Sequence, residues 1–325
     1  MKRLLPITLA GVLACLAATG AAAQDYPSRD VRMVVPWGAG GGTDGIVRKV
    51  STIAEKELGG TIYVENIEGG ISATGVMQAM SARPDGYTIA SLTYDSVVTV
   101  PWQKLLPGYN LEKLALIARI TSEADAIIAS ADASYGTFEE LIAAAKEQPG
   151  EIQVAIQNLG SRTHLTMLRL EGMTGAKFDL IAYPGGAAPQ KEALLSGEVD
   201  YAVTSLGDFA SLLDAGDAKG IVEFSDAPNP AYKDVPIAKD AGVDLEMGSF
   251  IVLAAPAGTP DDVIAELEDA YKAAYDSGEF QNWVAKVGVT PSWLGSGEVT
   301  DWANQTQGDL FTLMQDLEKQ GVLKQ

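Results

Sequence analysis

The sequence predicts an α/β protein of two lobes, in which each lobe is a doubly wound sheet with flanking helices. Apolar runs of strand length alternate with helical patterns along most of the 325 residues, an order typical of sheets covered by helices on both faces. A glycine-rich segment at residues 38–42 separates the first apolar run from the first helical pattern. A mature chain of about 300 residues is also long enough for two hydrophobic cores.

The first section of the chain predicts three strands separated by two helices. Apolar residues recur at helical spacing from Ile46 to Leu58, and the glycine pair at 59–60 ends that helix. A shorter helix ends near Pro84. This order predicts parallel strands, placed at 31–35, 61–65 and 87–92.

A second cycle of strands and helices begins after Thr121. Thr137 and Glu140 have the spacing of a capping box and predict the start of a helix over 141–146. Further helices are predicted through Leu165, at 187–195 and at 208–213. The strands of this section are predicted at 152–156, 178–183, 199–204 and 220–224.

The last section begins with an apolar strand at 250–254. The next helix is predicted to start with Thr259 as its cap and Pro260 at its first position, followed by two acids. Two more helices end the chain. Because more than one segment crosses between the two α/β units, we expect a hinge. The predicted division is a leader at 1–23, lobe one at 24–122 plus 252–325, and lobe two at 123–251.

The N-terminal residues have the pattern of a secretory signal peptide. Lys2 and Arg3 precede an apolar run at 4–18, and small residues at 21–23 predict cleavage near Ala23. The run is too short for a comfortable membrane span. A lipoprotein site ending at Cys15 is the weaker alternative. We therefore expect a periplasmic protein.

Composition excludes several classes of function. The formal net charge of −20 becomes −22 when the two leader cations are removed, and it argues against nucleic acids and anionic membranes as partners. It favours a soluble monomer. Cys15 lies in the leader, so the mature chain has no thiol for disulfides, catalysis or metal binding. With a single histidine and no calcium-loop motif, we expect no metal and no cofactor.

The glycine-rich segment after the first strand is the main candidate binding site. Its backbone N–H groups are unobstructed by side chains and lie at the positive end of a helix dipole, which suits an anion. Trp37 is either a wall of the cleft or a core residue. The candidate residues are Trp37, Gly38, Ala39, Gly40, Gly41, Gly42 and Thr43.

Other polar or glycine-rich loops also follow predicted strands, and ligands of such sheets bind at the carboxyl ends of the strands. Arg162 is the cation of one loop, although loop arginines more often point to solvent. His164 is expected to pack or to cap its helix. Whether Arg162 or Asp208 contacts the ligand stays open. The candidates are Gly70, Ile71, Ser72 and Thr74; Asn158, Gly160, Ser161 and Thr163; Gly185, Gly186 and Ala187; and Thr204, Ser205 and Asp208.

A series of short fragments, in order along nearly the whole mature chain, resembles the substrate-binding proteins of tripartite tricarboxylate transporters, the Bug-type periplasmic receptors. Departures lie in two loops: residues 37–39 replace the Phe-Pro-Pro of many relatives, and 68–73 replace a Gly-Ala-Gly-Gly-Asn segment. The fragments are Tyr26-Pro27-Ser28-Arg29, Val35-Pro36-Trp37, Gly40-Gly41, Thr43-Asp44, Glu65-Asn66, Gly69-Gly70, Pro84-Asp85-Gly86-Tyr87-Thr88, Gly160-Ser161, His164-Leu165, Tyr183, Gly185-Gly186, Gly197 and Pro256-Ala257-Gly258-Thr259-Pro260.

The resemblance implies a Venus-flytrap clamp that closes on a small carboxylate. It implies that backbone amides and ordered water of the first lobe hold one carboxylate, that the second lobe completes the cage, and that membrane transporter subunits receive the ligand. Few cations are predicted in the cleft, which favours a mono- or dicarboxylate over a tricarboxylate. Aromatic carboxylates and acidic amino acids stay open.

Enzymatic alternatives fit the sequence less well. The glycine segment lacks the last glycine of a dinucleotide fingerprint, no Lys-Ser/Thr follows it as in a P-loop, and no G-x-S-x-G elbow occurs. We therefore expect a solute receptor and not an enzyme. A ligand sensor with a regulatory partner is the main alternative, because the sequence does not separate sensing from transport, and a nucleotide-binding enzyme is less favoured.

Overall fold

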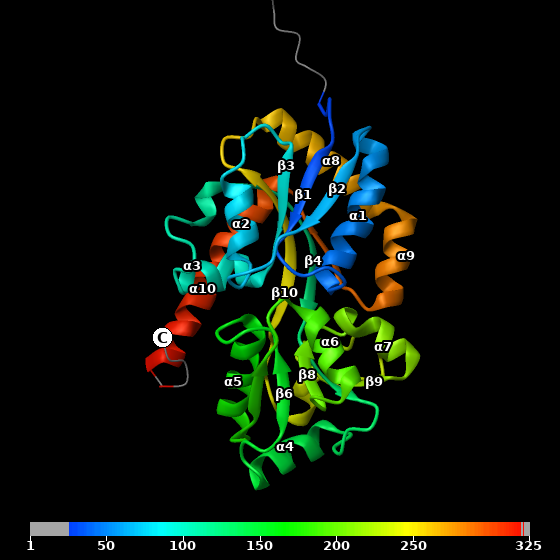
Figure 1. Ribbon diagram of the computed structural model, residues 1–325, viewed down its shortest axis with the longest axis vertical. Helices are drawn as coiled ribbons and strands as arrows, with labels where there is room; N and C mark the ends of the chain where they lie inside the picture. The colour runs from blue at the N-terminus through cyan, green and yellow to red at the C-terminus, as the bar shows by residue number, and fades with distance from the viewer. Residues whose placement is uncertain (1–25, 320, 322–325) are drawn as a thin grey trace, which may run out of the picture.

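The computed structural model describes residues 26–319 and 321, and its two sheets lie end to end along the long axis of the molecule (Figure 1). The first sheet has the strand order β11-β4-β10-β3-β1-β2, and the second has the order β7-β6-β8-β5-β9. The strands are β1 Val31–Val35, β2 Ile62–Asn66, β3 Thr88–Leu92, β4 Leu114–Ala124, β5 Ala126–Ser130, β6 Gln153–Ile156, β7 Asp179–Ala182, β8 Tyr201–Thr204, β9 Ala218–Glu223, β10 Gly248–Pro256 and β11 Pro291–Leu294.

Helices cover both faces of each sheet, as the sequence predicts. The α-helices are α1 Gly42–Leu58, α2 Ala73–Met80, α3 Val100–Trp102, α4 Phe138–Glu147, α5 Arg162–Thr174, α6 Ala187–Ser196, α7 Ala210–Ala215, α8 Asp261–Asp276, α9 Gly278–Val287 and α10 Ser296–Lys319. Short turns of other helical types are η1 Asp95–Thr99, η2 Leu111–Lys113, η3 Gly207–Phe209 and η4 Ala238–Ala241. Among the described residues, no helix combines the length and the apolar character that a membrane span requires.

The alternation of side chains along β1 shows how this strand, which lies between β3 and the edge strand β2, is buried on both faces of its sheet. Met33 and Val35 pack into a core with α1, α8 and α9, whereas Val34 faces a second core with α2 and α10. Successive side chains of a strand point to opposite faces, so a strand with apolar side chains on both faces is buried on both sides. The apolar residues of β1, interrupted only by the partly buried Arg32, therefore correctly indicate a covered sheet.

Both sheets are mixed, although the sequence predicts parallel strands. In the first sheet β1 is parallel to β2 and β3, but β10 is antiparallel to β3 and β4. In the second, β6 is parallel to β7 and β8, but β5 is antiparallel to β8 and β9. The antiparallel pairings involve β4, β5 and β10, which lie at the crossing between the lobes, and also β11, which follows α9 and pairs with β4. Strand–helix alternation therefore does not reveal the direction of these strands.

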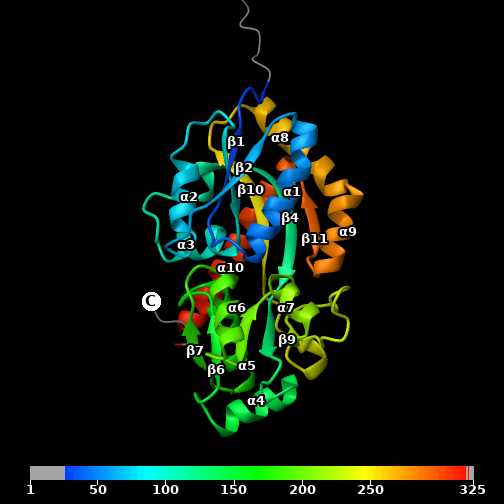
Figure 2. The same cartoon turned by 45° about the vertical axis from the view of Figure 1, so that its right-hand side comes forward.

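Two strands run between the sheets and form the hinge region (Figure 2). The chain passes from β4 into β5 with only Asp125 between the two strands. Strand β10 runs in the opposite direction beside β4 and brings the chain back to the first sheet. The Asp125 N–H donates to the Met247 carbonyl at 2.8 Å, and the Phe224 N–H donates to the Asp125 carbonyl at 2.7 Å. The division of the chain into lobes remains a prediction, and its boundaries fall within β4 and β10.

Local signals in the sequence had mixed outcomes. The capping box is confirmed: the Thr137 hydroxyl accepts from the Glu140 N–H at 3.3 Å, and the Glu140 carboxylate accepts from the Thr137 N–H at 3.2 Å. The prediction that Thr259 caps the next helix is wrong, because its hydroxyl donates to the Pro256 carbonyl at 2.8 Å and Pro260 directly precedes α8. Strands β4, β5 and β11 were not predicted.

Candidate functional site

A cavity lies between the two lobes, at the ends of strands from both sheets. Part of the predicted candidate set lines it. These residues are Trp37, Gly41, Gly42, Thr43, Gly185, Gly186, Ala187, Ser205 and Asp208. The cavity is also lined by residues that the sequence analysis did not include among the candidates, namely Thr93, Asp95, Glu123, Gln157, Arg162, Ser249 and Ile251.

The remaining candidates lie outside the lining and mostly shape the loops. The Gly40 N–H donates to Asp44, the Gly160 carbonyl accepts from Gln103, and the Thr163 hydroxyl accepts from the Gln157 N–H. His164 makes a local contact just before its helix, where its Nδ1 accepts from the Gly160 N–H at 2.8 Å. Candidates outside the lining are Gly38, Ala39, Gly40, Gly70, Ile71, Ser72, Thr74, Asn158, Gly160, Ser161, Thr163 and Thr204.

The glycine loops of the two lobes meet at the cavity. The Gly38 N–H donates to the Gly185 carbonyl at 3.0 Å, which joins the loop before α1 to the loop before α6. Both helices begin at a glycine N-cap, Gly41 and Gly186, so neither helix is capped by the side chain of its own N-cap residue. The first N–H groups of a helix have no partner within the helix and form the positive end of its dipole. The junction therefore offers two anion-binding helix starts to one cavity.

Trp37 forms a wall of this cavity. Its side chain is buried, and the indole N–H donates to the Thr93 hydroxyl at 3.1 Å. A Cβ atom at Gly186 would lie 3.5 Å from the indole ring, so the ring packs directly against the loop before α6. Trp37 thus combines the two roles that the sequence left open, because it belongs to the core of lobe one and also lines the cleft.

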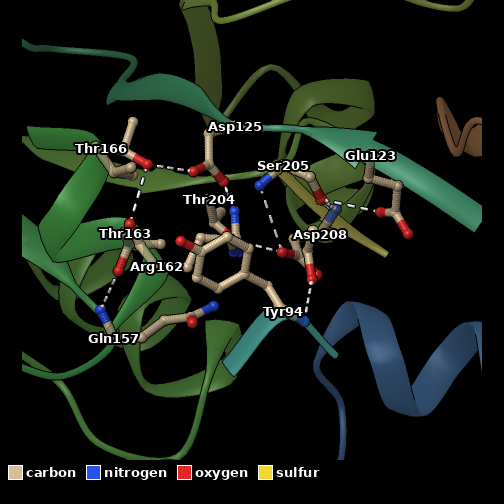
Figure 3. Close-up of polar contacts among 12 residues, drawn as sticks. Tyr94, Glu123, Asp125, Gln157, Arg162, Thr163, Thr166, Thr204, Ser205 and Asp208 are labelled. Atoms are coloured by element: carbon tan, nitrogen blue, oxygen red, sulfur yellow. Dashed lines mark hydrogen bonds and ion pairs between the residues drawn. The ribbon is translucent and has the colours of Figure 1, made fainter. Parts of the chain in front are cut away.

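Arg162 is buried, which corrects the expectation that it points to solvent. Only 4% of its side chain is exposed, and its guanidinium forms an ion pair with Asp125, whose side chain is fully buried at the hinge (Figure 3). The Thr166 hydroxyl donates to the same carboxylate at 2.6 Å. Burial lowers the pKa of Arg162, and the surrounding carboxylates oppose this shift. The sequence could not reveal the pairing because strands β4 and β5, which flank Asp125, were not predicted.

Asp95 connects the two lobes at the start of α5. Its Oδ1 accepts from the Arg162 backbone N–H at 2.9 Å and from the Thr99 hydroxyl at 2.6 Å. Burial raises the pKa of Asp95, and these hydrogen bonds oppose the rise. A carboxylate from lobe one thus occupies the N-terminus of a helix in lobe two, a position that the helix dipole favours.

Glu123 extends from the hinge strand β4 into the cavity. Its carboxylate accepts from the Thr121 hydroxyl at 2.9 Å and from the Ser205 hydroxyl at 3.2 Å. Burial and the nearby negative charge of Asp208 raise the pKa of Glu123 to about 7. The protonated form is therefore favoured in the folded protein at mildly acidic pH.

This raised pKa predicts a pH-dependent stability. Because the folded state binds the Glu123 proton more tightly than the unfolded state, its stabilising contribution is present below about pH 4.5 and is lost as pH rises through about 7. The full loss is about 3 kcal/mol. We expect Glu123→Gln to flatten the pH dependence of the free energy of unfolding, measured by urea denaturation between pH 4.5 and 8. The exposed Glu112→Gln serves as control, and equal curves for the two variants would contradict the prediction.

A second, wider cavity lies against the same hinge strands. Glu123 and Ser249 line both cavities. The second cavity extends toward Arg119 of β4 and toward Trp302 of the C-terminal helix α10. The helix starts of α1 and α6 do not line it. Within residues 26–319 and 321, no group of three histidine, cysteine or acidic residues is arranged to hold a metal ion. We therefore take the interlobe cavity as the candidate site.

Comparison with known proteins identifies the class of this molecule. A family model described as the tripartite tricarboxylate transporter family receptor matches residues 46–317. The chain belongs to this family. The family consists of solute-binding receptors, so this receptor is not an enzyme. The sequence resemblance is thereby confirmed.

Individual relatives cover almost the whole receptor. The UPF0065 protein in the gbd 5'region of Cupriavidus necator is 29% identical over 94% of this chain and 95% of its own. The periplasmic binding protein BugD is 27% identical, with a TM-score of 0.84 over 92% of this chain and 100% of its own. MatC from Rhodopseudomonas palustris, solved with bound malate, is 23% identical with a TM-score of 0.79 over 87% and 98%, which shows a shared fold.

Proposed function

We propose that the protein is an extracytoplasmic receptor that captures a small organic carboxylate between its lobes and delivers it to a tripartite membrane transporter. The observation that carries this proposal is the meeting of two helix starts at one cavity. Gly41 and Gly42 at the start of α1 and Gly186 and Ala187 at the start of α6 line the same space, and both N-caps are glycines, which have no side chain of their own to cap the helix. A carboxylate placed there accepts backbone N–H donors from both lobes.

The charges around the cavity favour a ligand with few carboxylates. Asp95, Glu123 and Asp208 line the cavity, and the lining cation, Arg162, is already paired with Asp125. A tricarboxylate would bring three more negative charges into a region that is already acidic. We therefore favour a mono- or dicarboxylate. The malate held by MatC is a dicarboxylate bound to a protein of the same fold.

The proposed compartment and partners follow from the family and the leader. The family description names a receptor of a tripartite transporter, so transporter subunits are the proposed recipients of the ligand. BugD is a periplasmic binding protein, and we propose the same location for this receptor. The leader at 1–23, with cleavage near Ala23, lies outside the described residues. We propose that the mature receptor acts as a monomer.

Thermal denaturation with candidate ligands tests the proposal. The mature protein is first unfolded and refolded to remove any retained solute, and then screened against mono-, di- and tricarboxylates, aromatic acids and acidic amino acids. A ligand at about a hundred times its Kd adds about 2.7 kcal/mol to the free energy of unfolding, a shift of several degrees in Tm. If no carboxylate shifts Tm, the proposed function is wrong.

A variant at the junction of the two helix starts tests whether the ligand-induced shift in Tm arises from binding in this cavity. A Cβ atom at Gly41 would lie 3.5 Å from the Gly38 carbonyl oxygen and 3.9 Å from the Ala187 nitrogen, so the backbone accepts a side chain. The methyl groups of valine would then fill the space between the two helix starts. We expect Gly41→Val to abolish the ligand-induced shift while the Tm of the free protein stays within a few degrees. A retained shift would place the ligand elsewhere.

A further inference from the structure

The cavity places negative side chains beside its positive helix starts. Backbone N–H groups of α1 and α6 face it, and the carboxylates of Asp95, Glu123 and Asp208 also line it. Asp208 lies directly against Gly42, because a Cβ atom added to Gly42 would collide with the Asp208 carboxylate. A negative group is thus held immediately next to the proposed carboxylate seat, where it would repel a simple carboxylic acid.

Ser205 holds Glu123 and Asp208 together at this position. Its hydroxyl donates to Glu123 at 3.2 Å and accepts from the Asp208 N–H at 3.2 Å. The Ser205 N–H and the Thr204 hydroxyl donate to the Asp208 carboxylate (Figure 3). Glu123 comes from the hinge strand and Asp208 from the second lobe, so residues far apart in the sequence build one acidic pair.

Neither carboxylate of this pair has a cationic partner. Among residues 26–319 and 321, no ion pair involves Glu123 or Asp208, although only 9% of Glu123 is exposed. Arg162, which also lines the cavity, forms its ion pair with Asp125. A buried carboxylate without a cation is costly. The described residues contain no group of three or more histidine, cysteine or acidic side chains arranged to hold a metal ion, so we look for the missing positive charge on an organic ligand.

We propose that the captured carboxylate also carries a protonated amine, which Glu123 and Asp208 bind. This inference rests on the proposed function. The contact between Asp208 and Gly42 requires that the two charges of the ligand lie close together, as they do on an α-amino acid. The carboxylate then contacts the helix starts and the ammonium contacts the acidic pair. A charge-assisted hydrogen bond from an ammonium is stronger than one from a neutral hydroxyl.

Matched ligand pairs test this inference with the unaltered receptor. Refolded protein is titrated calorimetrically with aspartate and succinate, glutamate and glutarate, and alanine and propionate, which differ in the amine alone. N-acetyl derivatives of the same amino acids remove the positive charge and keep the nitrogen. We expect one amino acid to bind about 30-fold or more tightly than its partner acid and its N-acetyl form.

Isosteric variants assign the preference to the acidic pair. Asp208→Asn and Glu123→Gln are each expected to reduce the ratio of amino-acid to acid affinity by about tenfold or more, while Glu68→Gln, an exposed acid near the same glycine loops, leaves the ratio unchanged. If acids bind as tightly as their amino counterparts, the inference is wrong and the proposed function stands. If neither class binds the refolded receptor, the proposed function fails and the inference fails with it.

Discussion

Gly42→Ala is expected to weaken ligand binding by about 10- to 100-fold, the effect of a steric conflict of about 1–3 kcal/mol. Gly42 is the first residue of α1 in lobe one, and Asp208 belongs to lobe two. A Cβ atom at Gly42 would collide with the Asp208 carboxylate and lie 3.3 Å from the Asp208 Cα, so a rotation of the side chain alone does not relieve the conflict. The two lobes must separate slightly, which removes one helix start from the ligand.

Gly45→Ala is the matched control for this prediction. It lies in the same helix, and a Cβ atom there would meet nothing within 4 Å. Because alanine favours helix over glycine by about 1 kcal/mol, this variant should be more stable than the parent and should bind normally. Calorimetric titration measures both affinities, and small-angle scattering with ligand reports the separation of the lobes. Equal affinities for the two variants would show that the contact between α1 and Asp208 is not needed for binding.

Arg162→Leu is expected to lower the free energy of unfolding by about 3–5 kcal/mol, because it leaves the fully buried Asp125 without its cation. The Thr166 hydroxyl donates to Asp125, but one neutral donor does not replace a guanidinium. The double variant Arg162→Leu with Asp125→Asn removes the uncompensated charge and should recover a large part of the loss. Urea denaturation of the refolded proteins measures both effects.

Arg169→Leu is the control that distinguishes the loss of the buried ion pair from the general effect on stability of removing an arginine from this helix. Arg169 lies on the same helix, and its guanidinium donates to the Glu246 carbonyl at 3.1 Å near the surface. Loss of such a contact should cost about 1 kcal/mol. If Arg162→Leu is no more destabilising than Arg169→Leu, the pair with Asp125 does not stabilise the hinge as described.

The parts of the site that were predictable from sequence are backbone features. Glycine-rich loops between an apolar strand and a helix are local patterns, and the loops at Gly41 and Gly186 do line the cavity. Their function depends on N–H groups and helix dipoles, which follow from secondary structure. Two candidates outside the lining have other contacts: the Gly40 N–H donates to Asp44 within its own loop, and the Gly160 carbonyl, in the loop before α5, accepts from the distant Gln103.

The charged part of the site could not be predicted in the same way. Glu123 and Asp125 lie in and next to β4, a strand whose pairing with β10 is antiparallel and long-range, and no local signal marked it. Asp95 begins the short helical segment η1 after β3, and its contact with the Arg162 N–H joins residues 67 positions apart in the chain. Burial and partner determine the charge state of each group, and both come from segments distant in the chain.

The sequence by itself determined the order of strands and helices apart from β4, β5 and β11, and also the capping box at Thr137, the glycine loops and the family resemblance. Each of these depends on residues that are close in the chain or on the type of residue at a position. Only the tertiary structure decided that Arg162 is buried against Asp125 and that Glu123 and Asp208 share one Ser205. Electrostatic interactions act through space and depend strongly on burial. The interactions of charged groups from the two lobes are therefore decided only when folding brings those groups together.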